Sequence, residues 1–223
     1  MAELAALRFV LALLLALVLA CQPEAASTRS RMGLTSEETA RSQRHEVLFA
    51  ADFESGWPRG MSVDRERVWS VVDGKLRAQL PDRKQERSFA YVGSEEWSDY
   101  AVDVDVYGDR GVDKGIAVRA DGGKGVGIDL RSGSYNDVVM YRGFSQLGRA
   151  PASNLNGKWY HLRVEVRGNQ YRVYVNRALK LDYTDEDNAR PRGCVALAAY
   201  TGGAGACLLY FDNLVVTRVD ERS

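Results

Sequence analysis

The chain has 223 residues, and its 30 basic and 30 acidic side chains cancel to a formal net charge of zero. No excess of positive charge therefore indicates nucleic acid or an anionic membrane surface as a partner. With 21 glycines, 11 tyrosines and only 5 prolines, the composition favours a β-rich globular domain over a disordered chain.

Residues 1–20 predict a signal peptide. Arg8 precedes twelve apolar residues that end at Ala20, fewer than the roughly 17–25 that cross a bilayer. The next residue closes the sequence "VLAC", which is similar to a bacterial lipobox, so Cys21 is the expected lipidation site; an ordinary cleaved signal is the alternative. Gln22 is not the aspartate that retains lipoproteins in the inner membrane. We therefore expect an exported outer-membrane lipoprotein that faces the periplasm or the surface and touches the membrane through its lipid anchor only.

The remaining chain divides into three parts by composition. Residues 21–45 are polar and charged, which suits a flexible tether, residues 46–218 form the globular domain, and residues 219–223 are a tail. If Cys21 is lipidated, Cys194 and Cys207 remain as one pair that an oxidising compartment permits to bridge. A hairpin centred on "TGGAG" would leave them several residues out of register, whereas a bridge needs Cα atoms within about 7 Å. The disulfide is left open.

The globular part is a series of short alternating runs separated by Gly, Asp and Asn, which is typical of an all-β sandwich or barrel. No long amphipathic helix interrupts them, and thirteen strands suit a large jelly roll. The expected strands are 47–53, 67–72, 75–80, 88–93, 98–107, 114–120, 125–131, 137–142, 158–167, 170–176, 179–183, 194–200 and 207–217.

The segment from Trp159 to Asp185 gives the most detailed register. A turn at "RGNQ" places Val166 opposite Tyr171, and a three-residue loop at 176–178 keeps Val175 opposite Leu179. Opposite charges that face each other across strands stabilise a sheet by roughly 0.2–1 kcal/mol per pair, which indicates a structural role for the charges on the outer face. This register aligns three of them in one row: Glu165, Arg172 and Asp182.

The valine-rich strand "YAVDVDVY" sets two aspartates on one face. The next hairpin pairs Val118 with Ile128 and Ile116 with Leu130, and alternation then places Arg119 beside one of the aspartates. One interpretation is a sugar-binding face, and the other is a solvated ladder of ion pairs. Seven side chains are expected on this face: Asp103, Asp105, Tyr107, Arg119, Asp129, Arg131 and Tyr141.

Longer motifs carry a family resemblance. The runs "LFAADFESGWP", "VWSVVDGKLRA", "DKGIAVRA" and "GIDLR" precede "GKWYHLRVEVRGNQYRVYVNRALKLDY" and "YFDNLVV". Together they resemble the concanavalin A-like lectin/glucanase superfamily in its laminin-G-like branch, nearest the bacterial 3-keto-disaccharide hydrolase group. The resemblance implies a jelly-roll sandwich of two antiparallel sheets whose concave face commonly binds carbohydrate. Because that fold hosts lectins and hydrolases alike, it does not decide the function.

The catalytic motif of the related laminarinases is absent. Those enzymes carry E-x-D-x-E or E-x-D-x-x-E on a concave strand, whereas this chain has Asp103 and Asp105 followed by Tyr107 and Gly108. An adjacent Arg119 would also hold both carboxylates ionised, whereas a general acid needs a raised pKa. We therefore expect a domain that binds a glycan or cell-envelope polysaccharide without catalysis. The alternatives are a glycoside hydrolase of the 3-keto-disaccharide type and a structural or protein-interaction module.

No cofactor is expected, with one exception. Asp52 and Glu54 on the first strand would meet Asp212 on the last if the termini lie side by side, and such hard oxygen ligands suit a structural calcium ion. Simple edge charges are the alternative. The tryptophans are either core residues or platforms for sugar rings; three of them are candidates for the second role: Trp57, Trp97 and Trp159.

Overall fold

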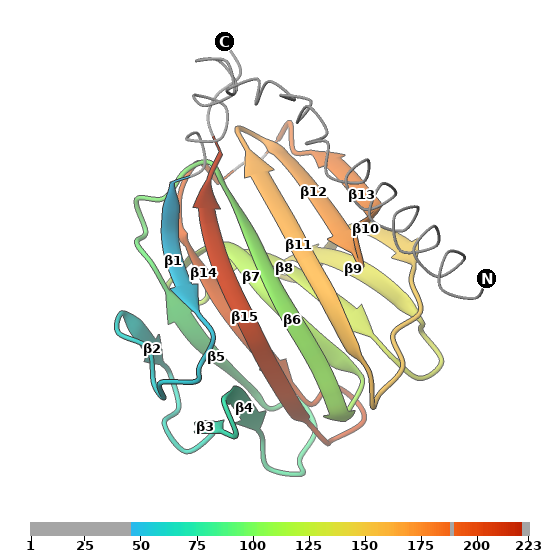
Figure 1. Ribbon diagram of the computed structural model, residues 1–223. Coiled ribbons are helices and arrows are strands. Elements are labelled where there is room, and N and C mark those ends of the chain that lie inside the picture. The colour runs from blue at the N-terminus through green and yellow to red at the C-terminus, as the bar shows by residue number, and fades with distance from the viewer. Residues whose placement is uncertain (1–45, 188–189, 220–223) are drawn as a thin grey trace, which may run out of the picture. The chain divides into compact units, whose positions relative to one another are not determined.

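The structure, a computed structural model, describes residues 46–187 and 190–219. The described residues form fifteen β-strands in two antiparallel sheets that face each other (Figure 1), which confirms the predicted all-β sandwich. The predicted signal peptide, Cys21, the tether and the last four residues lie outside the described residues. No helix in the described part of the chain is long and apolar enough to cross a membrane.

Sheet A holds eight strands in the order β13-β12-β11-β6-β15-β4-β3, with β1 also paired to β15. These strands are β1 (Val47–Ala51), β3 (Trp69–Val72), β4 (Lys75–Gln79), β6 (Tyr100–Arg110), β11 (Trp159–Arg167), β12 (Gln170–Val175), β13 (Ala178–Thr184) and β15 (Leu208–Arg218). Sheet B holds seven strands in the order β10-β9-β8-β7-β14-β5-β2. They are β2 (Met61–Val63), β5 (Arg87–Val92), β7 (Asp113–Asp121), β8 (Lys124–Arg131), β9 (Asp137–Arg142), β10 (Ser145–Pro151) and β14 (Cys194–Tyr200).

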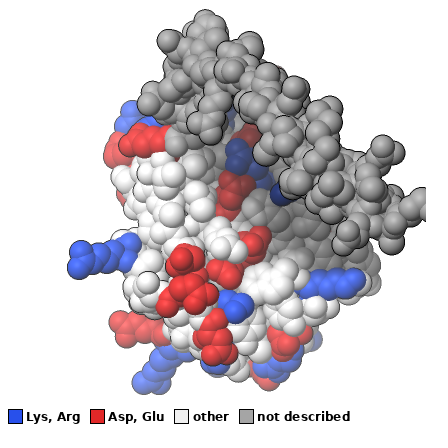
Figure 2. Space-filling model, in the orientation of Figure 1, with Lys and Arg blue, Asp and Glu red and all other residues white. Residues whose placement is uncertain are grey.

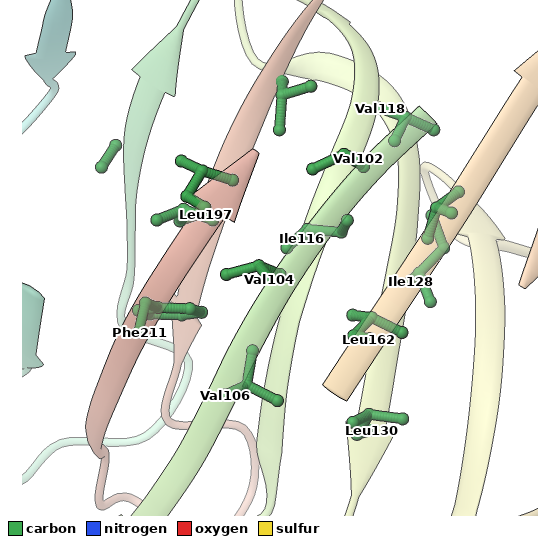
Figure 3. Close-up of a cluster of buried hydrophobic side chains, with 14 of the residues drawn as sticks. Val102, Val104, Val106, Ile116, Val118, Ile128, Leu130, Leu162, Leu197 and Phe211 are labelled. Atoms are coloured by element: carbon green, nitrogen blue, oxygen red, sulfur yellow. The ribbon is translucent and has the colours of Figure 1, made fainter. Parts of the chain in front are cut away.

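The core lies between the two sheets and follows the alternation of the sequence. Val102, Val104 and Val106 of β6 are fully buried and meet Ile116 and Ile128 from sheet B (Figure 3). Each such side chain contributes about 1.5–3 kcal/mol when it is removed from water. Because alternate residues face the core, the polar residues between them lie on the outer faces, where a ligand has access.

Two edge strands of sheet B were not predicted. β2 spans only three residues, and β10 reads "SQLGRAP", in which no apolar residue alternates with a polar one. An edge strand buries little of either face, so its sequence carries a weak periodic signal.

The hairpin of β11 and β12 confirms the predicted pairs, including Val166 with Tyr171 and the row Glu165, Arg172 and Asp182. The three-residue loop is wrong. Asn176 and Arg177 form a two-residue turn with φ of 50° and 69°, as a type I′ turn requires, and Val175 pairs with Ala178. A register shift in the pairing of β12 with β13 then restores the predicted face, and it leaves Leu179 51% exposed rather than in the core.

The register of the β7–β8 hairpin also differs from the prediction by two residues. Ile116 pairs with Ile128, and Val118 pairs with Val126, because the chain turns at Gly122 and a bulge interrupts the pairing after Val118. A shift of two keeps every side chain on its predicted face, so only the neighbours across the hairpin change.

The two described cysteines do not form the disulfide that the sequence left open. Cys194 lies at the start of β14, where its Sγ donates a hydrogen bond to the carbonyl oxygen of Ala120 at 3.3 Å. Cys207 is fully buried in the main core, and both thiols are free. Burial raises the pKa of the Cys207 thiol to about 12, which keeps it protonated.

Candidate functional site

The seven predicted ligand residues do not share one face. β6 and β7 are consecutive in the chain but belong to opposite sheets. Asp103, Asp105 and Tyr107 therefore lie on the outer face of sheet A, whereas the residues from β8 and β9 lie on the outer face of sheet B. The latter are Asp129, Arg131 and Tyr141.

Arg119 belongs to neither outer face, so the prediction that it lies beside the aspartates of β6 is wrong. Its backbone adopts φ of 48° at the bulge of β7, and its side chain is fully buried at one end of the sandwich. The guanidinium donates to the carbonyl oxygens of Ser98, Gly168 and Arg190 and pairs with Asp99 at 3.1 Å. Arg119 therefore fixes loops in place and has no access to a ligand.

The carboxylates of β6 are held by neighbours on sheet A. His161 lies between them, with Nδ1 2.9 Å from Asp105 and Nε2 3.1 Å from Asp103. Arg163 pairs with Asp103 at 2.5 Å, and Asn213 donates to Asp105 at 2.9 Å. Figure 2 looks onto this face and shows acidic side chains over its middle with basic ones nearby. The arrangement is the ladder of polar pairs that the sequence offered as one interpretation.

Aromatic side chains continue this face beyond the ladder. Tyr107 packs between Trp159 and Tyr210, with ring centroids 5.3 Å and 5.9 Å away. The Tyr107 ring is tilted by 42° to the ring of Trp159 and by 69° to that of Tyr210, so the three rings do not form one flat platform for a sugar. Of the other two candidate tryptophans, Trp57 donates to the carbonyl oxygen of Met61, and Trp97 packs edge-on against the buried Tyr100.

A groove lies on the opposite outer face, that of sheet B. Its cavity volume is about 640 Å³, which falls within the range of small-molecule sites. Residues from five strands (β5, β7, β8, β9 and β14) and from five loops line it. "The groove" below means the cavity formed by Gln85, Arg87, Phe89, Val112, Asp113, Asp129, Arg131, Tyr135, Tyr141, Gly143, Phe144, Ala198, Ala199, Tyr200 and residues 202–204. Three predicted ligand residues, Asp129, Arg131 and Tyr141, are therefore brought together here.

Small residues form the middle of this face. Large residues alternate with these small residues and point into the core. Because glycine and alanine have small side chains or none, the outer face of the sheet has a depression here. At Gly115 an added Cβ would lie 2.1 Å from the carbonyl oxygen of Ile128 and 2.5 Å from a carboxylate oxygen of Asp129. The Asp129 side chain thus occupies space that only glycine leaves open. Five small residues adjoin across three strands: Gly115, Ala117, Gly127, Ala196 and Ala198.

Two carboxyl groups face the groove without a partner cation. Asp129 on β8 pairs laterally with Gly115 on β7. Asp113 lies two residues before Gly115 on β7, so the side chains of Asp113 and Asp129 are diagonal neighbours. Within residues 46–187 and 190–219 neither carboxylate makes a hydrogen bond or an ion pair. The nearby Arg131 is held by Asp137 through bonds of 2.8 and 2.7 Å, and it donates to the Tyr141 hydroxyl at 3.0 Å.

The same environment shifts the protonation of the pair. Burial, together with the negative charge of Asp113, raises the pKa of Asp129 to about 7, although the charges of Arg131 and Arg87 oppose the shift. Burial also raises the pKa of Asp113, against the opposing charges of Arg131 and Lys114. Asp137 behaves in the opposite way, because its hydrogen bond from Arg131 lowers its pKa. A carboxyl group in a cleft with a pKa near neutrality is suited to proton transfer.

The walls of the groove are aromatic and cationic. On one side Arg87 lies 5.1 Å from the ring centroid of Tyr200, whose hydroxyl hydrogen bonds to Gln85. On the other side Arg131 stacks 4.3 Å from the ring centroid of Tyr135. Phe144 stands fully exposed at the rim. The walls therefore offer apolar faces for a ring and donors for hydroxyl or carbonyl oxygens.

The structure gathers no set of metal ligands in its described part. No group of three or more His, Cys, Asp or Glu side chains there lies close enough to hold a metal ion, and Asp52, Glu54 and Asp212 do not converge. Asp52 instead accepts a hydrogen bond from the backbone of Glu54 at 3.2 Å, and Asp212 accepts one from that of Asn213 at 2.7 Å. The calcium site stays a prediction that no gathered set of ligands supports.

Sequence reasoning missed Asp113, Arg87 and Tyr200. Arg87 and Asp113 each lie one residue before an expected strand, 88–93 and 114–120, and Tyr200 was counted only as a strand residue. A signal was present: glycine or alanine recurs at alternate positions on two neighbouring strands, in "GIA" and "ALA". Small residues aligned across strands predict a hollow on that face of the sheet.

The sandwich with a groove on one outer face defines a concanavalin A-like jelly roll. The chain belongs to the family described as 3-keto-alpha-glucoside-1,2-lyase-like domain, which matches residues 45–217. The predicted resemblance to the concanavalin A-like superfamily and to this group is thereby confirmed. No curated protein matches the chain.

Solved structures share the fold at low identity. The carbohydrate-binding module CBM66 from Bacillus subtilis is 18% identical, with a TM-score of 0.58 over 70% of this chain and 93% of that chain. The exoplasmic/lumenal domain of VIP36, solved with Ca²⁺ and Man3GlcNAc, is 10% identical, with a TM-score of 0.62 over 81% and 92%. The Crh5 transglycosylase is 14% identical, with a TM-score of 0.61 over 78% and 84%. Binding proteins and an enzyme thus share this architecture.

Proposed function

We propose that this domain binds a carbohydrate in the groove of sheet B. The observation that carries the proposal is the groove itself, about 640 Å³ in volume, whose lining combines carboxyl, guanidinium and phenol groups with the small residues Ala198, Ala199 and 202–204. Apolar ring faces with a few convergent polar groups are typical of a site for a small polar ring. The expected partner is therefore a glycan rather than a protein surface.

The ligand class that we propose is a 3-keto-α-glucoside. The family description supports it, because it names this class and the lyase reaction at carbons 1 and 2. The chemistry of the groove agrees, since Arg87 and Tyr141 offer donors for a ketone oxygen while Asp113 accepts from hydroxyls. Binding without catalysis was expected because Asp103 and Asp105 lack the third carboxylate of the laminarinase motif. The ion pairs and hydrogen bonds of these two residues on sheet A do not bear on the carboxyl pair in the groove.

The test is isothermal titration of the full-length protein with methyl 3-keto-α-D-glucopyranoside and with unoxidised methyl α-D-glucopyranoside. We expect the keto sugar to bind more tightly. Tyr200→Ala should weaken its binding at least about tenfold, or 1.4 kcal/mol, because the variant removes one wall of the groove. Tyr107→Ala on sheet A is the matched control and should bind as the wild type does. Absence of binding, or equal losses in the two variants, would contradict the proposal.

The chain is further proposed to be an exported outer-membrane lipoprotein anchored at Cys21. The support is the short apolar run that ends in "VLAC" and the polar tether that follows. Cells expressing the chain should incorporate labelled palmitate into it, and Cys21→Ala should lose the label and release the protein into the soluble periplasmic fraction. A label that persists in Cys21→Ala would contradict the anchor.

A further inference from the structure

We propose that Asp113 and Asp129 are the catalytic acid–base pair of the groove. Asp113 takes the proton from carbon 2 of the bound sugar, and Asp129 gives a proton to the oxygen that leaves carbon 1. The inference rests on the proposed function, because it takes a 3-keto-α-glucoside as the bound ligand.

The pair has the geometry that the reaction needs. Asp113 is on β7 and Asp129 on β8, on one face and diagonal to each other. Diagonal neighbours lie about 7–8 Å apart at their Cβ atoms, so two carboxyl groups at this spacing reach both ends of one sugar carbon–carbon bond.

Both carboxyl groups lie against glycines. An added Cβ would come within 2.5 Å of Asp129 at Gly115 and within 2.8 Å of Asp113 at Gly202, whose φ is +50°. Arg131 makes no ion pair with either carboxylate, because Asp137 holds it through two hydrogen bonds, although its charge still lowers the pKa of both. Both carboxyl groups therefore line the groove without an ion pair inside the described part of the chain, unlike the carboxylates of β6, although Asp113 is only 9% exposed.

The surrounding charges set which member of the pair carries a proton. Burial raises the pKa of both carboxyl groups; the charges of Arg131 and Lys114 then favour the ionised form of Asp113, whereas Asp113 favours the protonated form of Asp129. Because the pKa of Asp129 rises to about 7, this residue stays protonated up to neutral pH while Asp113 serves as the base. The charged or titratable groups that face the pair are Arg87 on β5, Lys114 on β7, Arg131 on β8, Asp137 and Tyr141 on β9 and Tyr200 on β14.

The step balances without an oxidant or a second reactant. The ketone at carbon 3 acidifies the hydrogen on carbon 2, and the Asp113 carboxylate removes it as a proton. The electron pair of that bond forms the double bond between carbons 1 and 2, and the bond from carbon 1 to the glycosidic oxygen breaks. That oxygen takes the proton of Asp129 and leaves as an alcohol. The proton on Asp113 then passes to Asp129 or to water.

The experiment separates the two proton transfers. The full-length protein is incubated with methyl 3-keto-α-D-glucopyranoside in D₂O, and proton NMR follows deuterium exchange at carbon 2 and release of methanol. We expect both in the wild type. Asp113→Asn should lower both rates by at least about a hundredfold, as loss of a general base does. Asp129→Asn should lower methanol release by about a hundredfold while exchange stays within about tenfold.

A better leaving group tests the acid directly. 4-Nitrophenoxide leaves without a proton, so Asp129→Asn should release it from 4-nitrophenyl 3-keto-α-D-glucopyranoside within about tenfold of the wild-type rate. Asp103→Asn, a carboxylate variant on sheet A, should match the wild type in every assay. The pH dependence of the wild type tests the acid as well. Its rate of methanol release should fall as pH rises past about 7, because Asp129 loses its proton, whereas its rate of 4-nitrophenol release should not.

Each contrary result has a distinct meaning. If the keto sugar binds but neither exchange nor release occurs, the acid–base pair is overturned and the binding site stands. If the sugar does not bind, the proposed function fails and the pair with it. Equal losses with both leaving groups in Asp129→Asn, or a flat wild-type pH profile for methanol release, would overturn the role of Asp129.

Discussion

Each outer face of the sandwich carries a pair of aspartates, and the two pairs differ in their partners. On sheet A, Asp103 and Asp105 are engaged by His161 and Arg163. On sheet B, Asp113 and Asp129 have no such partner, although an arginine lies beside them. The difference lies in where each arginine points: Arg163 pairs with Asp103 although it also pairs with Glu165, whereas Arg131 pairs with Asp137 and with neither aspartate of the groove.

The arginine of sheet B is held by a third carboxylate. Asp137 is almost fully buried and accepts from both Arg131 and Arg149. It therefore removes the cation that would otherwise convert the groove into a ladder like that of sheet A. The contrast between the faces depends on this one residue more than on the carboxyl pair itself.

Removing the charge of Asp137 should therefore erase the contrast and have the largest effect on stability. Asp137→Asn removes the ion pairs that Arg131 and Arg149 make with Asp137, which should lower the free energy of unfolding by about 3 kcal/mol, measured by urea denaturation. The freed Arg131 should also lower the pKa of Asp129, measured by ¹³C NMR titration. An unchanged pKa would show that Asp137 does not keep the guanidinium from the pair.

Enlarging Gly115, which lies against the Asp129 side chain, should have the next largest effect. Gly115→Val places a side chain against the carbonyl oxygen of Ile128 and the carboxylate of Asp129, so it should cost about 2–3 kcal/mol by overpacking and abolish binding of the keto sugar. Gly127→Ala is the matched control, because an added Cβ there meets nothing within 4 Å. Thermal unfolding and titration of both variants check this. A Gly115→Val protein that binds normally would place the ligand elsewhere.

The raised pKa of Asp129 should appear as a pH dependence of stability. Its folded pKa is about 7 against an ordinary value of 3.8, so between these values the native state holds a proton that the unfolded chain has lost. Stability should therefore fall as pH rises, by on the order of 2 kcal/mol between pH 5 and pH 8 relative to Asp129→Asn. Urea unfolding of both proteins at the two pH values measures the difference, and a rise with pH would contradict the assigned direction.

The smallest effect is expected on sheet A. Asp103→Asn breaks partly exposed pairs with His161 and Arg163, which should change the free energy of unfolding by at most about 1 kcal/mol. Titration with the keto sugar should be indistinguishable from the wild type. A loss of binding in this variant would return the site to the face that the strand "DVDV" first indicated.

The fold was predictable because alternation is local. The alternating residues Val102, Val104 and Val106 predict a strand with one buried face, and the pairing of Val166 with Tyr171 follows from a short turn. Departures came from backbone features that side-chain patterns do not reveal, namely the positive φ at Arg119 and the register shift that leaves Leu179 exposed. Each departure moves one side chain without changing the sheet.

The site was only half predictable. Alternation assigned Asp129, Arg131 and Tyr141 to an outer face correctly, but it cannot say which of two sheets a strand joins. That assignment depends on long-range pairing, here of β6 with β15 and of β7 with β14. The charges of Asp103 and Asp113 look alike in the sequence, and only the tertiary neighbours make one a structural pair and the other a free carboxylate.

The most direct test of the central claim is a crystal structure of the full-length Asp113→Asn variant with methyl 3-keto-α-D-glucopyranoside. We expect the sugar ring in the groove, with carbon 1 beside Asp129 and the ring edge against Tyr200. A sugar bound on sheet A between Tyr107 and Trp159, with the groove free of it at saturating concentration, would contradict the account.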